Sequence, residues 1–164
     1  MSRKLITLTG LGALLILGLP AVTRAVEARV IGVSENDKAM NQAIADARAK
    51  LPHFWAVMAA PKNGESDFCL KVKITEGEAV EHFWCTDLRI ENGILSGVIG
   101  NDAEMVKKVH LGQRIAIRTP DISDWLYMKA DKMIGNYTVR PLMKSMSKEE
   151  VSFLKAKLGE LPKD

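Results

Sequence analysis

Metal-binding and phosphate-binding motifs are missing from this sequence. It has two cysteines and three histidines in 164 residues, and none of them forms a Cys-x-x-Cys, His-x-His or His-Glu-x-x-His pattern. Beyond the first 25 residues there is no glycine-rich phosphate loop, and no Gly-x-Ser-x-Gly segment marks a nucleophile elbow. We therefore expect no metal and no cofactor.

Acidic residues are absent from the first 25 positions. Met1 to Lys4 is a short basic start, Leu5 to Thr23 carries no charge, and Thr23-Arg24-Ala25 places small residues three and one before a possible cut. This layout predicts a signal peptide over residues 1–25 and export to the periplasm. The alternative is an uncleaved anchor in the inner membrane, although Leu5 to Leu19 is shorter than the roughly 20 apolar residues of a spanning helix.

An excess of positive charge is also absent once the leader is removed. Arg3, Lys4 and Arg24 belong to the 23 basic residues, so residues 26–164 carry 20 basic residues against 20 acidic ones. Because binding to a phosphate backbone depends on clustered Lys and Arg, we expect no nucleic-acid partner. Residues 26–164 have the usual length of one globular domain.

The spacing of apolar residues predicts helices at both ends of this domain. Met40, Ala43, Ile44, Ala47 and Leu51 recur at helical spacing after a capping box at residues 34–37, and residues 53–60 indicate a shorter helix. Residues 138–145 and a closing helix, which follows a second capping box at residues 147–150 and stops at Gly159, make up the C-terminal pair.

The centre of the chain alternates apolar and polar residues, as strands do. The expected strands are residues 68–75, 80–89, 94–99, 114–118 and 125–129, and Asn92-Gly93 between two of them is a strong hairpin signal. The order of elements predicts an α+β fold, with an antiparallel β-meander of about five strands and N-terminal and C-terminal helices packed on it.

Cys69 and Cys85 are expected to form a disulfide. A first hairpin centred on Gly77 would place them opposite each other, would pair Lys73 with Glu81, and would put Leu70 beside Trp84 on the apolar face. A periplasmic location favours oxidation of such a pair. The alternative, two free thiols with a catalytic or metal-binding role, has no supporting spacing.

Two clusters of polar and aromatic residues are candidate sites. The first contains Glu81, His82 and Trp84, where His82 is either a hydrogen-bonded core residue or a general base tuned by burial. The second would bring chain segments together across a turn at Ala130-Asp131, and its candidate binding residues are Asp124, Trp125, Lys132, Asn136, Tyr137 and Arg140. In this second cluster Asp124 either caps a turn and pairs with Lys132 or Arg140, or belongs to a recognition patch.

These motifs resemble those of the domain of unknown function 2314 family. The resemblance rests on residues 81–84, 97–101, 122–125, 132–133 and 135–140, and it covers roughly Ala39 to Leu158. The family includes small exported bacterial proteins and domains attached to larger proteins. It has no established activity, so the resemblance implies a domain identity and no catalytic residues.

Three functional interpretations remain at this point. The first is a non-catalytic, exported protein-binding module of the inhibitor or immunity type, with a protein partner in the envelope. The second is a small envelope hydrolase or transferase that uses His82 and Asp124, which would have to lie within hydrogen-bond reach of each other. The third, a module that binds cell-wall glycans, requires the rings of Trp84, Trp125 and Tyr137 to be exposed.

Overall fold

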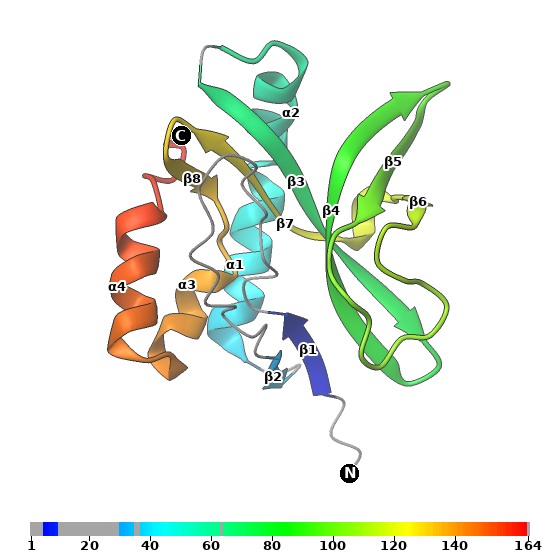
Figure 1. The fold of residues 1–164 in the computed structure, drawn as a ribbon, viewed down its shortest axis with the longest axis horizontal. Helices are drawn as coiled ribbons and strands as arrows, with labels where there is room; N and C mark the ends of the chain where they lie inside the picture. Colours follow the sequence, from blue (N-terminus) through cyan, green and yellow to red (C-terminus); the bar gives the residue numbers. More distant parts are fainter. Residues whose placement is uncertain (1–4, 10–29, 35–36, 63, 164) are drawn as a thin grey trace, which may run out of the picture.

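A twisted antiparallel sheet runs through the protein, with helices from both ends of the chain against it (Figure 1). The structure is a computed structural model that describes residues 5–9, 30–34, 37–62 and 64–163. The antiparallel strands, in the spatial order β6-β5-β4-β3-β7-β8, are β3 (Glu65–Glu76), β4 (Ala79–Glu91), β5 (Ile94–Ile99), β6 (Arg114–Ala116), β7 (Ile122–Lys129) and β8 (Lys132–Gly135). The predicted α+β class is confirmed, with six antiparallel strands instead of about five, because the chain after the Ala130-Asp131 turn returns as β8.

Two further strands join the sheet at β4, next to the part of β4 that pairs with β5. β1 (Leu5–Thr9) runs parallel to residues 80–82 of β4, and β2 (Val30–Ser34) pairs antiparallel with β1. β1 is the described part of the predicted leader, whereas the expected cleavage site after Ala25 lies outside the described residues. No helix in the part of the chain that the structure describes is long and apolar enough to cross a membrane.

The described residues form four helices, of which the first and the last begin at a side-chain cap and the two between them do not. They are α1 (Lys38–Ala49), α2 (Leu51–Ala59), the short α3 (Val139–Leu142) and α4 (Lys148–Lys157), with single 3₁₀ turns at Thr119–Asp121 and Met143–Ser145. Ser147 and Glu150 form the predicted capping box of α4. The predicted cap at the start of α1 is wrong: Asp37 itself accepts from the Met40 N–H, and Ser34 belongs to β2.

The register of the β3–β4 hairpin differs by one residue from the predicted one. Glu76 pairs with Ala79 across a two-residue turn, so Cys85 lies opposite Leu70 and not opposite Cys69. The sequence did not distinguish a turn centred on Gly77 from one centred between Gly77 and Glu78, and a one-residue slip moves every side chain to the other face.

The expected disulfide is therefore not formed. Cys69 and Cys85 are free thiols, and successive side chains of a strand point to opposite faces, so Cys69 faces away from the Leu70–Cys85 pair. Both are buried, at 2% and 0% exposure, and burial raises the pKa of each thiol to about 12.

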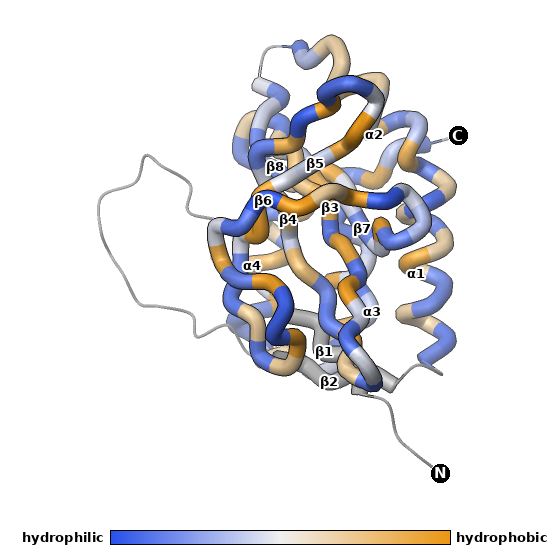
Figure 2. The backbone as a smooth tube through the Cα atoms, turned by 90° about the vertical axis from the view of Figure 1, so that its right-hand side faces the viewer, coloured by the Kyte–Doolittle hydropathy of each residue, from blue (hydrophilic) through white to orange (hydrophobic). Residues whose placement is uncertain are grey.

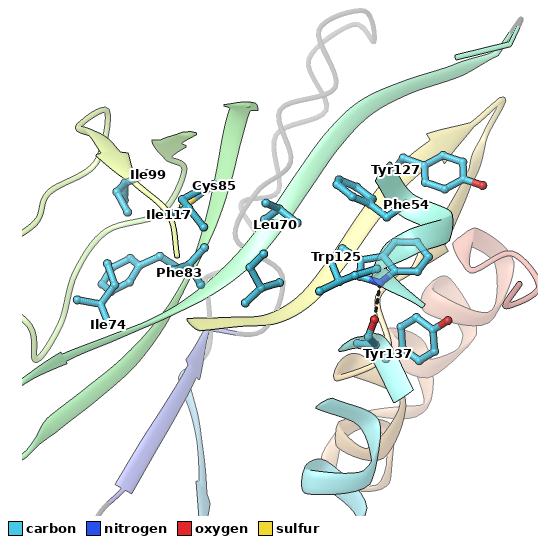
Figure 3. Packing of buried hydrophobic residues seen from close by; sticks show 14 of the residues in the cluster. Phe54, Leu70, Ile74, Phe83, Cys85, Ile99, Ile117, Trp125, Tyr127 and Tyr137 are labelled. Atoms are coloured by element: carbon cyan, nitrogen blue, oxygen red, sulfur yellow. Dashed lines mark hydrogen bonds between the residues drawn. The ribbon is translucent and has the colours of Figure 1, made fainter. Parts of the chain in front are cut away.

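The hydrophobic core has two parts that meet at Leu70 (Figure 3). On the helical side, Phe54 of α2 packs against Trp125 of β7, whose indole Nε1 donates to the Ala47 carbonyl of α1 at 2.8 Å. On the other side, Phe83 and Ile99 fill the space between the bent strands β3 to β6. The core face of β4 thus carries Phe83 and Cys85, whereas the predicted register placed Trp84 there.

Two strand edges remain unpaired beyond this core. β7 pairs with β3 only as far as the Val72–Ile122 contact, so residues 73–76 of β3 have no strand on that side within the described chain. β6 pairs with β5 and with no other described strand. Figure 2 faces the side of the molecule where β5 and β6 lie.

Candidate functional site

The most concentrated polar cluster lies in the interior, around the Asp124 carboxylate of β7. Asp124 is fully buried, at 0% exposure. Its Oδ1 accepts from the N–H groups of Trp125 and Tyr137 at 2.8 and 3.1 Å, and its Oδ2 accepts from the N–H and hydroxyl of Thr138 at 2.8 and 2.6 Å. Asp124 therefore holds the segment after β8 in place, which is the turn-capping alternative predicted for it.

Lys71 of β3 is the positive partner of this carboxylate, through the hydroxyl of Thr138. Its Nζ donates to Thr138 Oγ1 at 3.0 Å and lies 4.8 Å from the centre of the Trp84 ring. Burial lowers the pKa of Lys71 to about 8, although the nearby Asp124 charge opposes this lowering. Burial likewise raises the pKa of Asp124, against the charge of Lys71 and the donors from Thr138.

His82 lies beside this pair and contacts Ser123 instead of Asp124. Its Nδ1 is 2.7 Å from Ser123 Oγ, and the Ser123 hydroxyl donates to the Lys71 carbonyl at 3.2 Å. Ser123 thus links the His82 ring to the backbone of β3. Burial, together with the positive charges of Lys71, Lys73 and Arg48, lowers the pKa of His82 to about 3.

Glu81 is a structural carboxylate on the opposite face of β4. It is 0% exposed, and its two oxygens accept from the N–H groups of Glu104, Met105 and Val106 at 3.1 to 3.2 Å. It fixes the loop between β5 and β6 to the sheet. The cluster of Glu81, His82 and Trp84 is thus divided between the two faces of one strand.

The second predicted cluster is also divided. The Tyr137 N–H donates to Asp124, whereas the Asn136 N–H donates to the Trp125 carbonyl at 2.8 Å. The Tyr137 ring packs edge-on against Trp125, with 5.5 Å between the ring centroids. Lys132 instead donates to the Ala156 carbonyl of α4 at 2.6 Å, and Arg140 donates to the Gly159 carbonyl at 3.2 Å. Neither cation pairs with Asp124, because Lys71 takes that place.

The aromatic rings do not form a platform for sugar stacking. Trp125 and Tyr137 are 0% and 4% exposed, and Trp84 is half-buried under Lys71. The glycan-binding interpretation required all three rings to be exposed, so the burial of two of them removes its basis.

Lys71, Ser123 and Thr138 were not among the predicted site residues. Lys71 occupies a polar position of an alternating strand, which by pattern alone faces solvent. Its burial depends on Thr138, which lies 67 residues further along the chain. Among the described residues, no three His, Cys, Asp or Glu side chains gather closely enough to hold a metal ion.

Comparison with known proteins identifies the domain. The model of a family described as an uncharacterized protein conserved in bacteria (DUF2314) matches residues 37–160. The chain belongs to the DUF2314 family. These residues hold α1 to α4 and β3 to β8, so the DUF2314 domain includes the Asp124 cluster.

The DUF2314 domain has relatives among curated bacterial proteins. The chain is 43% identical over 121 residues to the uncharacterized protein YegJ of Escherichia coli, which covers 74% of this chain and 78% of that protein. It is 26% identical over 127 residues to a putative ankyrin repeat protein of Neisseria meningitidis serogroup B, with 72% of this chain and 50% of that protein covered. No solved structure matches the chain.

Proposed function

We propose that this protein is an exported, non-catalytic module that binds another protein in the bacterial envelope, as an inhibitor or immunity protein does. The observation that carries the proposal is the burial of the candidate acid–base residues. Glu81, His82 and Asp124 are 0–2% exposed, and all three hold other parts of the chain in place. A general acid or base needs access to its substrate, which these positions do not offer.

The hydrolase alternative is less well supported by the same geometry. It needs a hydrogen bond between His82 and Asp124 at the edge of a cleft, whereas the acceptor positions of Asp124 are taken by residues 125, 137 and 138. A histidine with a pKa of about 3 is also a poor base near neutral pH.

The family context favours a binding role. One relative carries a matching region in half of its length and is named as an ankyrin repeat protein. Ankyrin arrays are extended binding surfaces, so a domain joined to such an array is well placed to contact proteins. We extend this interpretation to the present chain as part of the proposal.

The basic start, apolar run and small-residue cut of residues 1–25 support export. We propose cleavage after Ala25 and a periplasmic location, with anchoring in the inner membrane as the alternative. Intact mass of the protein recovered from a periplasmic fraction tests this point. A chain that starts at Val26 is the expected product, and full-length protein in the membrane fraction would indicate the anchor.

Chemical crosslinking in living cells tests the binding role. We expect one discrete adduct with an envelope protein, a 1:1 complex when both proteins are purified, and loss of the partner's activity at an equal molar ratio. Turnover of an envelope substrate by the purified protein, abolished by Asp124→Asn in a variant that still folds, would contradict the proposal and favour the hydrolase.

A further inference from the structure

An open cavity separates the two unpaired strand edges, on the far side of the molecule from α4. Its volume is about 440 Å³, within the range of about 300–1,000 Å³ that is typical of ligand pockets. Residues 72–75 of β3 line one side, and Ile115 and Ala116 of β6 line the other. The bent sheet therefore has a gap between these two strands, where neither β7 nor a described loop completes the pairing.

The backbone of β3 presents hydrogen-bonding groups to this gap. The Lys71 carbonyl points toward β7, where Ser123 Oγ donates to it. Because alternate residues of a strand point their N–H and C=O groups to the same side, those of Lys73 and Thr75 point to this side as well. The Thr75 carbonyl confirms the direction, since it accepts from Lys108 Nζ at 2.7 Å. The Lys108 side chain thus satisfies one of the β3 carbonyls that a neighbouring strand would otherwise pair with.

The side chains around the gap combine an apolar floor with a basic rim. Val72, Ile74 and Val109 form the floor together with Ile115. The charged lining residues are three cations, Lys73, Lys108 and Arg118, and one carboxylate, Asp121. Arg118 and Lys108 are exposed to solvent. Arg118 Nε donates to Asp121 Oδ2 at 2.7 Å, so the net positive charge that the rim presents to an approaching partner comes from Lys73 and Lys108.

We infer that the gap between β3 and β6 binds an extended, acidic segment of a partner protein, which adds as a strand and places aliphatic side chains on the apolar floor and carboxylates on the basic rim. An extended peptide suits the two open edges because strand addition gives affinity through main-chain hydrogen bonds, while alternate side chains give specificity. The period of two matches the site, since Val72 and Ile74 lie on one face of β3 and Lys73 lies on the other. This inference rests on the proposed function, of which it names the surface and the class of partner.

Selection of random linear peptides displayed on phage, against the full-length protein, tests the inference. We expect the selected peptides to alternate aliphatic residues with Asp or Glu, to lack proline at the central positions, and to bind less tightly as salt is raised. On binding, hydrogen exchange of the Thr75 and Ala116 amides should slow, because Ile117 N–H donates to the Leu95 carbonyl of β5 and the amide of Ala116 therefore points away from β5. Selected peptides without acidic residues, or binding that leaves both amides unchanged, would overturn the inference.

Charge variants locate the binding. Lys108→Gln with Arg118→Gln should weaken the selected peptides about tenfold or more, which corresponds to about 1.4 kcal/mol. The matched control, Lys144→Gln with Lys155→Gln, removes two exposed charges from the helical side and should leave the affinity unchanged. Circular dichroism confirms that both variants fold. Equal affinity for the two double variants would rule out the basic rim as the site.

Failure of this binding surface can be distinguished from failure of the proposed envelope role. If the crosslinked envelope complex forms equally well with the Lys108→Gln/Arg118→Gln variant, the binding module stands and this surface is wrong. If peptides bind in the gap but no envelope complex forms in cells, the surface stands and the proposed role in the envelope fails. A photo-crosslinking residue in place of the exposed Ala116 should give the adduct with the envelope protein only if the binding role and the binding surface are both correct.

Discussion

At the scale of single residues, the interior is organised by a charge pair with a hydroxyl between its members. Lys71 donates to Thr138, and Thr138 donates to Asp124, so each charge is hydrogen-bonded although neither reaches water. Such a pair adds little net stability when complete, but the removal of one member leaves a buried charge without compensation.

Asp124→Asn should destabilise the fold strongly. The amide directs N–H groups at some of the four donors that now face the carboxylate, and Lys71 loses its counter-charge. We expect a loss of about 3–5 kcal/mol in the free energy of unfolding, measured by urea denaturation. Asp131→Asn, at a site whose side chain is 68% exposed, should stay within about 0.5 kcal/mol of wild type.

His82 should make stability depend on pH in the acidic range. Its pKa is about 3 in the folded protein and about 6.5 in an unfolded chain, so between these values the unfolded state binds more protons. Stability therefore falls as the pH drops from about 6.5 toward 3, by up to about 1.4 kcal/mol per pH unit.

Urea denaturation from pH 6 to pH 4 measures this slope. The free energy of unfolding should depend less on pH in His82→Asn than in wild type, and the difference in slope should correspond to up to one proton. The exposed His110 gives the matched control His110→Asn. Identical slopes for wild type and His82→Asn would show that His82 titrates normally in the folded protein.

At the scale of elements, single carboxylates and glycines fix how strands and loops meet. Glu81 accepts three backbone N–H groups of the loop before β6, and Gly135 allows the end of β8 to approach Trp125 closely. Neither role follows from residue type, because each depends on what the neighbouring strand brings to that position.

Glu81→Gln should loosen the loop at residues 104–106. The glutamine amide offers one acceptor oxygen to donors that now share two. We expect a cost of about 1.5–3 kcal/mol, as for hydrogen bonds to charged groups, together with faster hydrogen exchange of the three amides. Glu78→Gln, in the exposed turn of the same hairpin, should change neither quantity.

Gly135→Ala should be far more disruptive than an equivalent change at another glycine with positive φ. An added Cβ at Gly135 would lie 2.4 Å from the Trp125 carbonyl oxygen, where φ is 91°. Gly112 has a similar φ of 82° with no atom within 4 Å of the added Cβ. Gly112→Ala thus carries the backbone strain alone, and the difference in melting temperature between the two variants measures the clash with Trp125.

At the scale of the whole molecule, local patterns predicted more than long-range ones did. Asn92-Gly93 specified its hairpin, and both residues have the positive φ that a two-residue turn needs. The capping box at Ser147 and Glu150 was equally local. These signals depend on neighbours within a few residues, so the sequence contains all the information that they require.

The failures come from contacts between distant segments. The β3–β4 register depends on where the turn is centred, and the sequence pattern allowed two centres equally. Asp124 was a predicted candidate residue and lies in the interior polar cluster, but its partner Lys71 lies in a strand whose alternation favoured exposure. The gap between β3 and β6 was not predicted, because it depends on where β7 stops pairing with β3.

The distance along the chain between Lys71 and Thr138 also has a kinetic consequence. The β3–β4 and β4–β5 hairpins close through two-residue turns, whereas the contact of Lys71 with Thr138 spans 67 residues and carries a larger loop-closure entropy. We expect the hairpins to form in the rate-limiting step and the Lys71–Thr138–Asp124 contacts to form after it. Thr138→Val should then speed unfolding and leave the refolding rate almost unchanged in stopped-flow measurements, whereas an equal effect on both rates would place these contacts in the folding nucleus.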